Sequence, residues 1–358
     1  MKVVSLFTGA GGLDLGFARA GFSTAVACEM NKDACATYRA NLGPEMVEGD
    51  VRELIGRLHS GAAEAVVGGP PCQGLSIAGK MDPLDPRSTL IDSYFDAVEK
   101  VAPQTFVMEN VDALLSMKKW ALRLSAIRAR AQAMGYGLFC TVLNAADFGV
   151  PQSRRRFFAI GGRGMTDDEV AAIVRPVVAA LKTAPTPAIE VFRRLGPQGT
   201  ALNPATSRAI VTFSKNPVMR PTAYAGMLFN GAGRPIDPSR PSPTITASAG
   251  GNKTHLVDEE QVFGSGRSFS EAYHAHLSKG GAPGALQIPS TLRRMTLEES
   301  RAFQTFPEGF AFHGPTSARY RQIGNAVPAG LAFVVATAAR AVLDAARSGR
   351  ESGFDVAA

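Results

Sequence analysis

The sequence predicts an α/β fold, with a doubly wound, Rossmann-like sheet in a first domain and a second, smaller and loop-rich domain. Short apolar runs alternate with helix-like stretches over residues 1–165, and a glycine-rich loop follows the first of these runs. From about residue 183 to residue 289 the chain becomes irregular and rich in proline and glycine. Strands separated by helices indicate a parallel sheet, and frequent prolines exclude long regular elements from the second part.

The predicted strands are short apolar runs bounded by turn residues. They cover residues 3–7, 24–28, 65–68, 105–108, 138–143 and 157–161, and a further short strand should end near Asp50. Helical periodicity returns at residues 296–306 and 331–347, and the latter stretch carries one apolar stripe.

These patterns predict a domain plan. We expect residues 1–165 to form a catalytic and cofactor-binding domain that residues 322–347 complete. Residues 166–321 should form the second domain with a bracing helix, and residues 348–358 a frayed tail.

Composition favours a folded enzyme. The 358 residues are 45% hydrophobic, and 38 Lys and Arg against 31 Asp and Glu give a net charge of +7, which suits a polyanionic partner. No apolar run of membrane-spanning length and no leader-like start are evident, so we expect a cytoplasmic protein without a membrane partner. The four cysteines lack metal-ligand spacing, so we expect no metal.

The glycine-rich loop Phe7–Gly12 contains Gly9, Gly11 and Gly12, lies at the carboxyl end of the first predicted strand and opens a helix. Open α/β sheets bind ligands at this edge. Glu29 follows Gly11 by 18 residues, close to the spacing at which nucleotide folds place a carboxylate on a ribose.

Asp14 stands where a pyrophosphate-binding loop carries its third glycine, and an acid near the helix start would repel phosphate. We therefore expect a nucleoside cofactor without phosphates, and S-adenosylmethionine fits best. Glu29 would hold its ribose, Asp50 its adenine amino group, and Phe7 would pack near the base. The alternative is a glycine turn with a structural role only.

Cys72 differs from the other cysteines. It follows a buried strand, Gly68–Gly69 and then Pro70–Pro71, on a stiffened turn at the same sheet edge as the glycine loop. Cys28, Cys35 and Cys140 are expected to be core residues. Cys72 is therefore the candidate nucleophile.

A carboxyl group should lie near this thiol. The fifth predicted strand ends in Met108–Val111, which places Glu109 at the same edge. In a dry pocket, a protonated Glu109 could donate to a ring nitrogen. Asn110 is expected to support the local backbone, and without Cys72 Glu109 would be interpreted as an N-terminal helix acid.

The ordered motifs of the chain resemble the bacterial, S-adenosylmethionine-dependent DNA cytosine-5 methyltransferase family. The similarity runs collinearly from about residue 3 to residue 340. The motifs that carry it are Phe7–Gly12, Glu29, Asp50, Pro70–Gln73, Glu109–Val111, Gln152–Arg156, Arg294–Pro307 and Gly324–Pro328.

The resemblance implies a mechanism. The Cys72 thiolate attacks C6 of cytosine while Glu109 holds N3 and the exocyclic amine, so that C5 becomes nucleophilic and is methylated. S-adenosylhomocysteine is the product of the cofactor. Arg154 and Arg156 would contact the base or its phosphate and lower the thiol pKa, whereas Arg155 should point the opposite way. The base that removes the C5 proton is left open.

The resemblance also implies further contacts. A stacked cytosine must be flipped out of the duplex, and residues 73–87 form a loop suited to close over it. The cofactor site would further include Val51, Pro71, Leu90, Asn325 and Val327. The predicted DNA contacts are Gln73, Ser76, Arg87, Arg220, Arg234, Arg240 and Lys253.

The last four of these contacts lie in a stretch from Arg208 to Lys253 with six basic residues and one acid, where the family carries its target-recognition domain. The alternative for these cations is a solvated surface. The helix around Thr296 and Glu299 should brace that domain.

Three other interpretations compete with a DNA methyltransferase. A relative could methylate transfer RNA with the same residues, a silent module could bind DNA only, and composition alone would allow a nicotinamide dehydrogenase. We expect a monomer that acts on double-stranded DNA near the nucleoid. A cognate restriction endonuclease could be encoded nearby, or the enzyme could be solitary, and its recognition sequence is left open.

Overall fold

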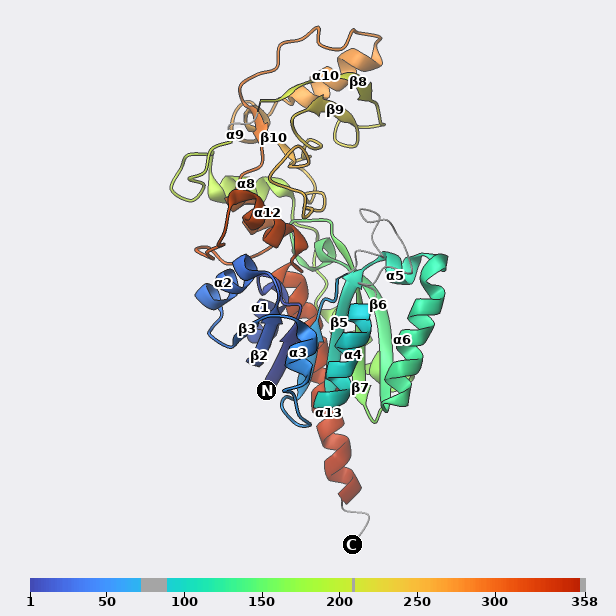
Figure 1. Cartoon of the computed structure of the whole chain (residues 1–358). Coiled ribbons are helices and arrows are strands. Elements are labelled where there is room, and N and C mark those ends of the chain that lie inside the picture. Colours follow the sequence, from blue (N-terminus) through green and yellow to red (C-terminus); the bar gives the residue numbers. More distant parts are fainter. Residues whose placement is uncertain (72–88, 208–209, 355–358) are drawn as a thin grey trace. The chain divides into compact units, whose positions relative to one another are not determined.

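The structure, a computed structural model, describes residues 1–71, 89–207 and 210–354 (Figure 1). It divides into two compact units. The first comprises Met1–Phe148, Arg155–Thr183 and Val327–Ala358, and the second comprises Gly149–Arg154 and Ala184–Ala326. The first unit extends past the expected boundary at residue 165, because helix α7 (Asp167–Ala180) packs on strand β6 and on the C-terminal helix.

The first unit is built on a seven-stranded sheet in the order β3-β2-β1-β4-β5-β7-β6. Each predicted strand is present within a few residues of its expected ends. The strands are β1 (Lys2–Leu6), β2 (Ser23–Glu29), β3 (Met46–Glu48), β4 (Ala65–Gly68), β5 (Thr105–Val111), β6 (Tyr136–Asn144) and β7 (Arg155–Arg163).

The sheet is mixed, so the expectation of an all-parallel sheet was wrong at β7. Strands β1 to β5 pair in parallel, but β7 runs antiparallel to both β5 and β6. The segment between β6 and β7 contains only a short 3-10 helix, η3 (Ala145–Phe148). Parallel neighbours need a longer crossover, usually an α-helix, and this connection is too short to supply one.

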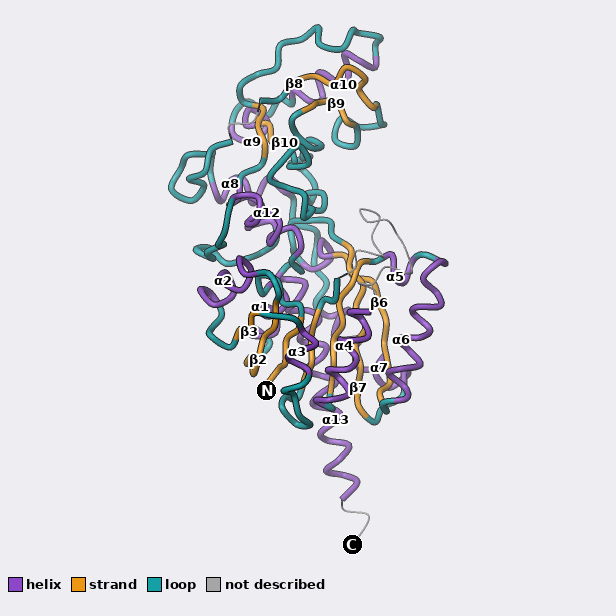
Figure 2. The backbone as a smooth tube through the Cα atoms, in the orientation of Figure 1, coloured by secondary structure: helices purple, strands orange, loops and turns teal. Residues whose placement is uncertain are grey.

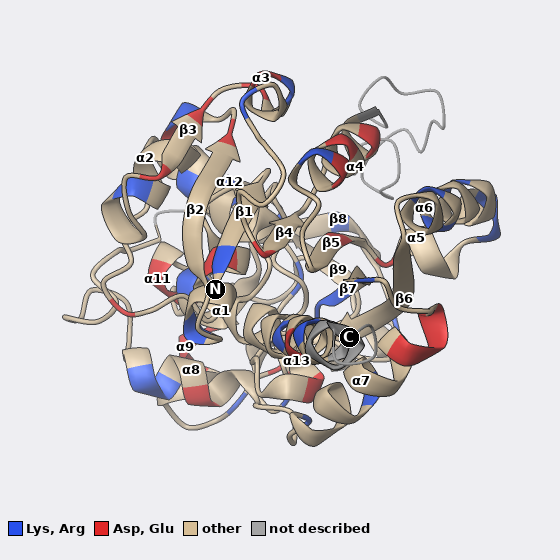
Figure 3. Ribbon diagram, turned by 90° about the horizontal axis from the view of Figure 1, so that it is seen from below, with Lys and Arg blue, Asp and Glu red and all other residues tan. Residues whose placement is uncertain are grey.

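Helices cover both faces of the sheet (Figure 3). On one face lie α1 (Gly12–Arg19), α7 and α13 (Ala329–Phe354), which pack on one another. A Cβ at Gly16 would lie 2.3 Å from the Ala332 carbonyl carbon, so a glycine is required where α1 crosses α13. The other face carries α3 (Val51–Ile55), α4 (Thr89–Val101), α5 (Ala113–Ser116) and α6 (Ala121–Ala133), while α2 (Lys32–Asn41) packs on β2 and β3.

The C-terminal helix α13 is longer than expected, since it continues to Phe354 rather than ending near residue 347. By length and composition alone, the helical stretch Thr316–Ser348 is apolar enough to cross a membrane. However, 72% of its most apolar window is buried inside the protein, as in a core helix. The predicted stripe along this helix, including Leu331, Val335 and Val342, is fully buried.

The second unit consists mostly of loops, which Figure 2 shows in teal. Its short elements are α8 (Ala188–Leu195), β8 (Thr212–Val218), β9 (Met227–Asn230), β10 (Leu256–Asp258), α9 (Glu259–Phe263), α10 (Phe269–Ser278), β11 (Leu292–Arg294), α11 (Leu297–Phe303) and α12 (Thr316–Asn325). Tyr273 is fully buried among Phe213, Phe229 and Phe269, with ring centroids 4.4 to 6.3 Å away. This aromatic cluster gives the loops a core of their own.

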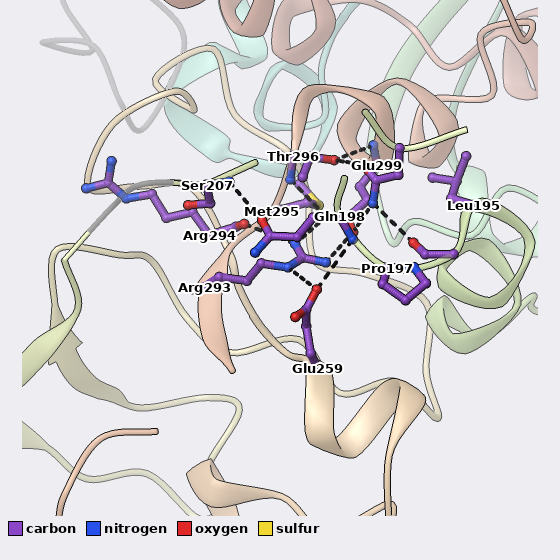
Figure 4. Close-up of polar contacts among 12 residues, drawn as sticks. Leu195, Pro197, Gln198, Ser207, Glu259, Arg293, Arg294, Met295, Thr296 and Glu299 are labelled. Atoms are coloured by element: carbon purple, nitrogen blue, oxygen red, sulfur yellow. Dashed lines mark hydrogen bonds and ion pairs between the residues drawn. The ribbon is translucent and has the colours of Figure 1, made fainter. Parts of the chain in front are cut away.

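A buried ion pair braces the second unit (Figure 4). Arg293 donates from both terminal nitrogens to the two Glu299 carboxylate oxygens, at 2.7 and 2.9 Å. Glu299 also closes a capping box with Thr296 at the start of α11, and Asn203 donates to its carboxylate. Thr296 and Glu299 therefore have structural roles in this unit.

Candidate active site

The sheet order reverses between β1 and β4, which are neighbours although β2 and β3 intervene in the sequence. Loops that leave the carboxyl ends of such strands diverge and leave a crevice, where open α/β sheets bind ligands. The glycine loop follows β1, and Gly69, Pro70 and Pro71 follow β4. Both predicted motifs therefore start at the switch point.

The glycine loop is held by Glu29 at the end of β2. The Gly9 N–H donates to one Glu29 carboxylate oxygen at 3.0 Å, and the Asn31 N–H donates to the other at 2.8 Å. Phe7 has φ 55° and Gly9 has φ 54°, so the chain turns sharply directly after β1. Glu29 thus fixes the loop and still offers free lone pairs at the sheet edge.

Two glycines of this loop have opposite surroundings. A Cβ on Gly11, which has φ 85°, would lie 2.2 Å from Leu42 Cδ1, so glycine is needed for packing. A Cβ on Gly9 would meet nothing within 4 Å. Backbone that is open on this side, next to a carboxylate, fits a nucleoside cofactor that approaches the loop closely.

Asp14 does not face the open edge. Its side chain is 3% exposed and accepts a hydrogen bond from the Tyr38 hydroxyl at 3.1 Å. Burial raises the pKa of Asp14 to about 6, although the Tyr38 hydrogen bond favours the ionised form. The Asp14 carboxyl group is buried against Tyr38, so, contrary to expectation, it would not meet a phosphate at the open edge of the loop.

Asp50 caps α3, since its carboxylate accepts from the Arg52 N–H at 2.9 Å. It also pairs with the Arg52 side chain, and this hydrogen bond holds the pKa of Asp50 below its usual value. Strand β3 lies beside β2, so Asp50 and Glu29 follow neighbouring strands at the same edge. Val51, the first residue of α3, is buried.

Glu109 and Arg156 form an ion pair on neighbouring strands, with 3.0 Å between Arg156 Nε and Glu109 Oε1. Val111 pairs with Arg156 in register, so Glu109, two residues earlier on β5, is a diagonal neighbour on the same face. Both side chains are largely buried, with 13% and 16% exposure. Arg155 points away and lies 3.4 Å from Asp112, as predicted.

The residues that precede Cys72 in the sequence, Gly69 and Pro70, contact strand β5, which carries Glu109. Asn110, which is 2% exposed, donates from its side-chain amide to the Pro70 carbonyl at 3.1 Å. Its expected role in supporting the backbone is confirmed. A Cβ on Gly69 would lie 2.9 Å from a Glu109 carboxylate oxygen, so a larger residue there would push the Glu109 side chain out of its position. The doubled glycine was the only sequence signal for this contact.

Several predicted site residues, namely Cys72, Gln73, Ser76 and Arg87, lie outside the described residues. Pro71 and Leu90, which flank that stretch, are half-buried. Cys28 and Cys35 are buried, and Cys140 is partly buried. Burial raises the pKa of Cys28 and of Cys140 to about 11 and that of Cys35 to about 12, which keeps these thiols protonated and unreactive.

Arg154 belongs to the second unit and is 1% exposed. Its guanidinium donates to the Ile245 carbonyl at 2.8 Å and to the Gly324 carbonyl at 2.7 Å. Gln152 is fully buried and bonds to the Ile245 N–H, the Phe303 carbonyl and Gln304. The sequence did not indicate that this motif binds distant loops, because most of its partners are main-chain atoms, up to 170 residues away.

The predicted base-reading cations of the second unit, Arg220, Arg234, Arg240 and Lys253, are all exposed. Asn325 ends α12 and is exposed, whereas Val327 is buried in the first unit. The structure thus brings together Glu109 and Arg156 in one pair, and Gly9 and Glu29 in another.

Comparison with known proteins gives consistent matches. The profile of the family C-5 cytosine-specific DNA methylase matches residues 1–340. Type II methyltransferase M.NgoPII from Neisseria gonorrhoeae is 30% identical over 365 residues, covering 96% of each chain. Type II methyltransferase M.HindV from Haemophilus influenzae is 31% identical over 341 residues, covering 94% of this chain and 96% of that protein.

Solved structures agree in fold. The S. pombe Dnmt2 methyltransferase has a TM-score of 0.62 at 16% identity, and the Entamoeba histolytica methyltransferase EhMeth has 0.64 at 15% identity. Each match covers 96% of this chain and 98% of the other. At such identities the likeness shows the fold alone, and it confirms the predicted Rossmann-like sheet.

Proposed function

This chain belongs to the C-5 cytosine-specific DNA methylase family and is a DNA cytosine-5 methyltransferase, and we propose that Cys72 and Glu109 carry its chemistry. The observation that supports this assignment most directly is the Glu109–Arg156 pair beside Gly69 and Pro70. It puts a carboxylate and a cation at the sheet edge from which the chain leads into Cys72.

The family uses S-adenosylmethionine, which supplies an electrophilic methyl group to C5 of the base. In this chain we propose that Glu29 and Asp50 hold its ribose and adenine, with Phe7, Gly9, Gly11, Gly12, Val51, Pro71, Leu90, Asn325 and Val327 around them. The open backbone at Gly9 and the Glu29 carboxylate fit such a ligand. No residue in this proposal requires a metal.

The protein's own part in the reaction is to activate and then release the pyrimidine. The Cys72 thiolate forms a bond to C6, and the electron pair of the C5–C6 double bond moves toward C5. Protonated Glu109 donates to N3 as charge develops there, and its other carboxyl oxygen accepts from the exocyclic amine. After methylation a base removes the C5 proton, and the C6–S bond breaks to restore the double bond.

The arginines have separate tasks in this scheme. Arg156 holds the Glu109 carboxyl group in place through the 3.0 Å contact between Arg156 Nε and Glu109 Oε1. Arg154, buried among carbonyls of the second unit, acts as a positioning residue for the loops that bear Ile245 and Gly324. Its predicted contact with the base or phosphate stays a prediction.

DNA is the substrate, and the second unit is proposed to recognise the sequence around the target cytosine. Arg220, Arg234, Arg240 and Lys253 are exposed there and would contact phosphates or base edges. A stacked cytosine must leave the duplex to reach the sheet edge, and Gln73, Ser76 and Arg87 are proposed to hold the flipped nucleotide.

The relatives are named Type II methyltransferases. We propose that this enzyme acts as a monomer on nucleoid DNA in a bacterial cytoplasm. It would serve either beside a restriction endonuclease encoded nearby or alone, and the endonuclease need not touch it.

Transfer of labelled methyl groups from S-adenosylmethionine to duplex DNA tests the proposal, with bisulfite sequencing to map the modified cytosines. The wild type should methylate a fixed motif, and Cys72→Ala should bind cofactor but transfer nothing. A duplex with 5-fluorocytosine at the target should trap the wild type covalently and leave Cys72→Ala free. Methylation of transfer RNA but not of DNA, or DNA binding without any adduct, would reject this assignment.

A further inference from the structure

The turn between β5 and α6 carries an exposed cationic surface that the proposed mechanism does not use. It includes α5, the short 3-10 helix η2 (Lys118–Trp120) and the first turn of α6. Lys118 and Lys119 are both exposed. We call this segment, residues 113–123, the lysine turn.

The chain of this region carries cations without acids, although neighbouring elements supply carboxylates. Residues 113–146 contain five cations and no acid. The arginines of α6 are already used within the unit: Arg123 pairs with Asp92, Arg130 with Asp96, and Arg128 with Asp167. Among the residues that the structure describes, no carboxylate lies within 4 Å of the amino group of Lys118 or Lys119. The two lysines therefore present their charge outward.

The backbone that carries the two lysines is anchored by buried side chains. Trp120, directly after them, is 3% exposed and packs in the same core as Leu114 and Ile127. The Lys119 amino group lies 5.1 Å from the centre of the Trp120 ring. Because the backbone is anchored on both sides of the lysines, ordering them on a ligand costs little beyond side-chain entropy.

Exposed leucines flank the lysines. Leu122 is 87% exposed and Leu115 is 39% exposed, on the two sides of η2. Single exposed apolar residues are ordinary. Two leucines on one short turn with two lysines nevertheless offer apolar contact to the sugars of a backbone whose phosphates the lysines hold.

The lysine turn lies at the carboxyl end of β5, where Glu109 stands (Figure 1). From Glu109 to Lys118 the chain takes a few extended residues and one helical turn, which limits their separation to about 20 Å. Duplex DNA displays one phosphate charge per about 1.7 Å of its axis, or roughly 12 charges over that distance. A duplex with its target cytosine at Glu109 therefore brings phosphates within reach of these lysines.

We propose that the lysine turn is a DNA-backbone clamp on the catalytic unit, in which Lys118 and Lys119 bind phosphates close to the target cytosine. This inference rests on the DNA methyltransferase activity and adds a contact outside the second unit. It predicts affinity that depends on salt but not on sequence, because phosphate contacts position a duplex without reading it.

The test is the salt dependence of duplex binding by Lys118→Ala/Lys119→Ala, compared with wild type. Each lost phosphate contact lowers the slope of log K against log salt concentration by about 0.9, so we expect a decrease of about 1.8. At 0.1 M salt the affinity should fall roughly 10- to 50-fold. Leu122→Ala should weaken binding without changing the slope.

The matched control is Lys2→Ala/Lys100→Ala. It removes the same charge from exposed lysines at the start of β1 and in the last turn of α4, which lie at the opposite edge of the sheet. Its slope should match that of wild type within about 0.3. Equal slopes for both double variants would show a general charge effect and overturn the clamp.

Neutral methylphosphonate linkages locate the contact. Each linkage is placed singly around the target cytosine. At one or two positions it should lower the DNA affinity of the wild type. At those same positions it should not change the DNA affinity of Lys118→Ala/Lys119→Ala. If wild type and variant respond alike at every position, the clamp is rejected. Methylation of DNA by the wild type shows separately that the proposed activity is present. Unchanged cofactor affinity of the variant shows separately that the variant is folded.

Discussion

Arg156 on β7 reaches diagonally across to Glu109 on β5, with 3.0 Å between Nε and Oε1, whereas its neighbour Arg155 points to the other side and meets Asp112. Two adjacent arginines thus occupy opposite faces at one sheet edge. This geometry separates a role in catalysis from the general effect of a positive charge, because each arginine serves as the control for the other.

Arg156→Ala should lower kcat for methyl transfer by about 10²- to 10³-fold, the cost typical of losing one preorganised donor at an active site. Arg155→Ala should change kcat by no more than about threefold, because its pair with Asp112 is exposed and weak. Steady-state methylation with both variants checks this. Equal losses would mean that Arg156 acts through charge alone.

Asn110→Ala should loosen the turn that leads into Cys72. It leaves the Pro70 carbonyl without its donor, which costs about 1–3 kcal/mol of stability. The matched control is Thr105→Val, which removes another buried bond on β5, from the Thr105 hydroxyl to the Gly161 carbonyl at 2.9 Å. Both variants should lose similar stability in urea unfolding, but only Asn110→Ala should slow adduct formation with 5-fluorocytosine DNA. If both slow it equally, Asn110 is structural only.

The strands of the first unit were predictable because buried parallel strands are near-continuous apolar runs, as in Ala65–Gly68. Hydrophobic pattern does not encode strand direction, so the antiparallel β7 was missed. The pattern also predicted which side of a strand Arg155 and Arg156 occupy, because side chains alternate along a strand.

Residues bound to distant main-chain atoms could not be placed in this way. The expected contact of Arg154 with the base or its phosphate stays a prediction, but the sequence did not indicate that its guanidinium binds the carbonyls of Ile245 and Gly324. A carbonyl is present at every residue and carries no sequence signal, so such partners become visible only in the fold.

The inward position of Asp14 predicts a pH effect on stability. Its folded pKa of about 6 is raised above its usual value of 3.8 by burial, so the native state binds the proton more tightly than the unfolded chain does. The stabilisation is complete below about pH 4 and is lost as the pH rises through about 6, with a total of about 3 kcal/mol.

Asp14→Asn should remove this dependence. The variant should gain stability relative to wild type between pH 4 and pH 6 and keep a constant advantage above pH 7. Urea unfolding across this range, followed by the fluorescence of Trp120, reports on the first unit, because Trp120 is the only tryptophan of the chain. A constant stability difference at every pH would show that Asp14 does not titrate in this window.

The Arg293–Glu299 ion pair should contribute strongly to the stability of the second unit. Arg293 is 3% exposed and Glu299 is fully buried, so Arg293→Met or Glu299→Leu alone leaves a buried charge without its main partner and should cost about 3–5 kcal/mol. The double variant Arg293→Met/Glu299→Leu should lose much less than the sum of the two, because both charges leave together. Hydrogen exchange in β11 and α11 measures this directly, since Trp120 fluorescence does not report on the second unit. If the single losses simply add, each residue acts through its other contacts, such as Arg293 with Glu259 at 2.8 Å, and the pair itself does not hold the unit together.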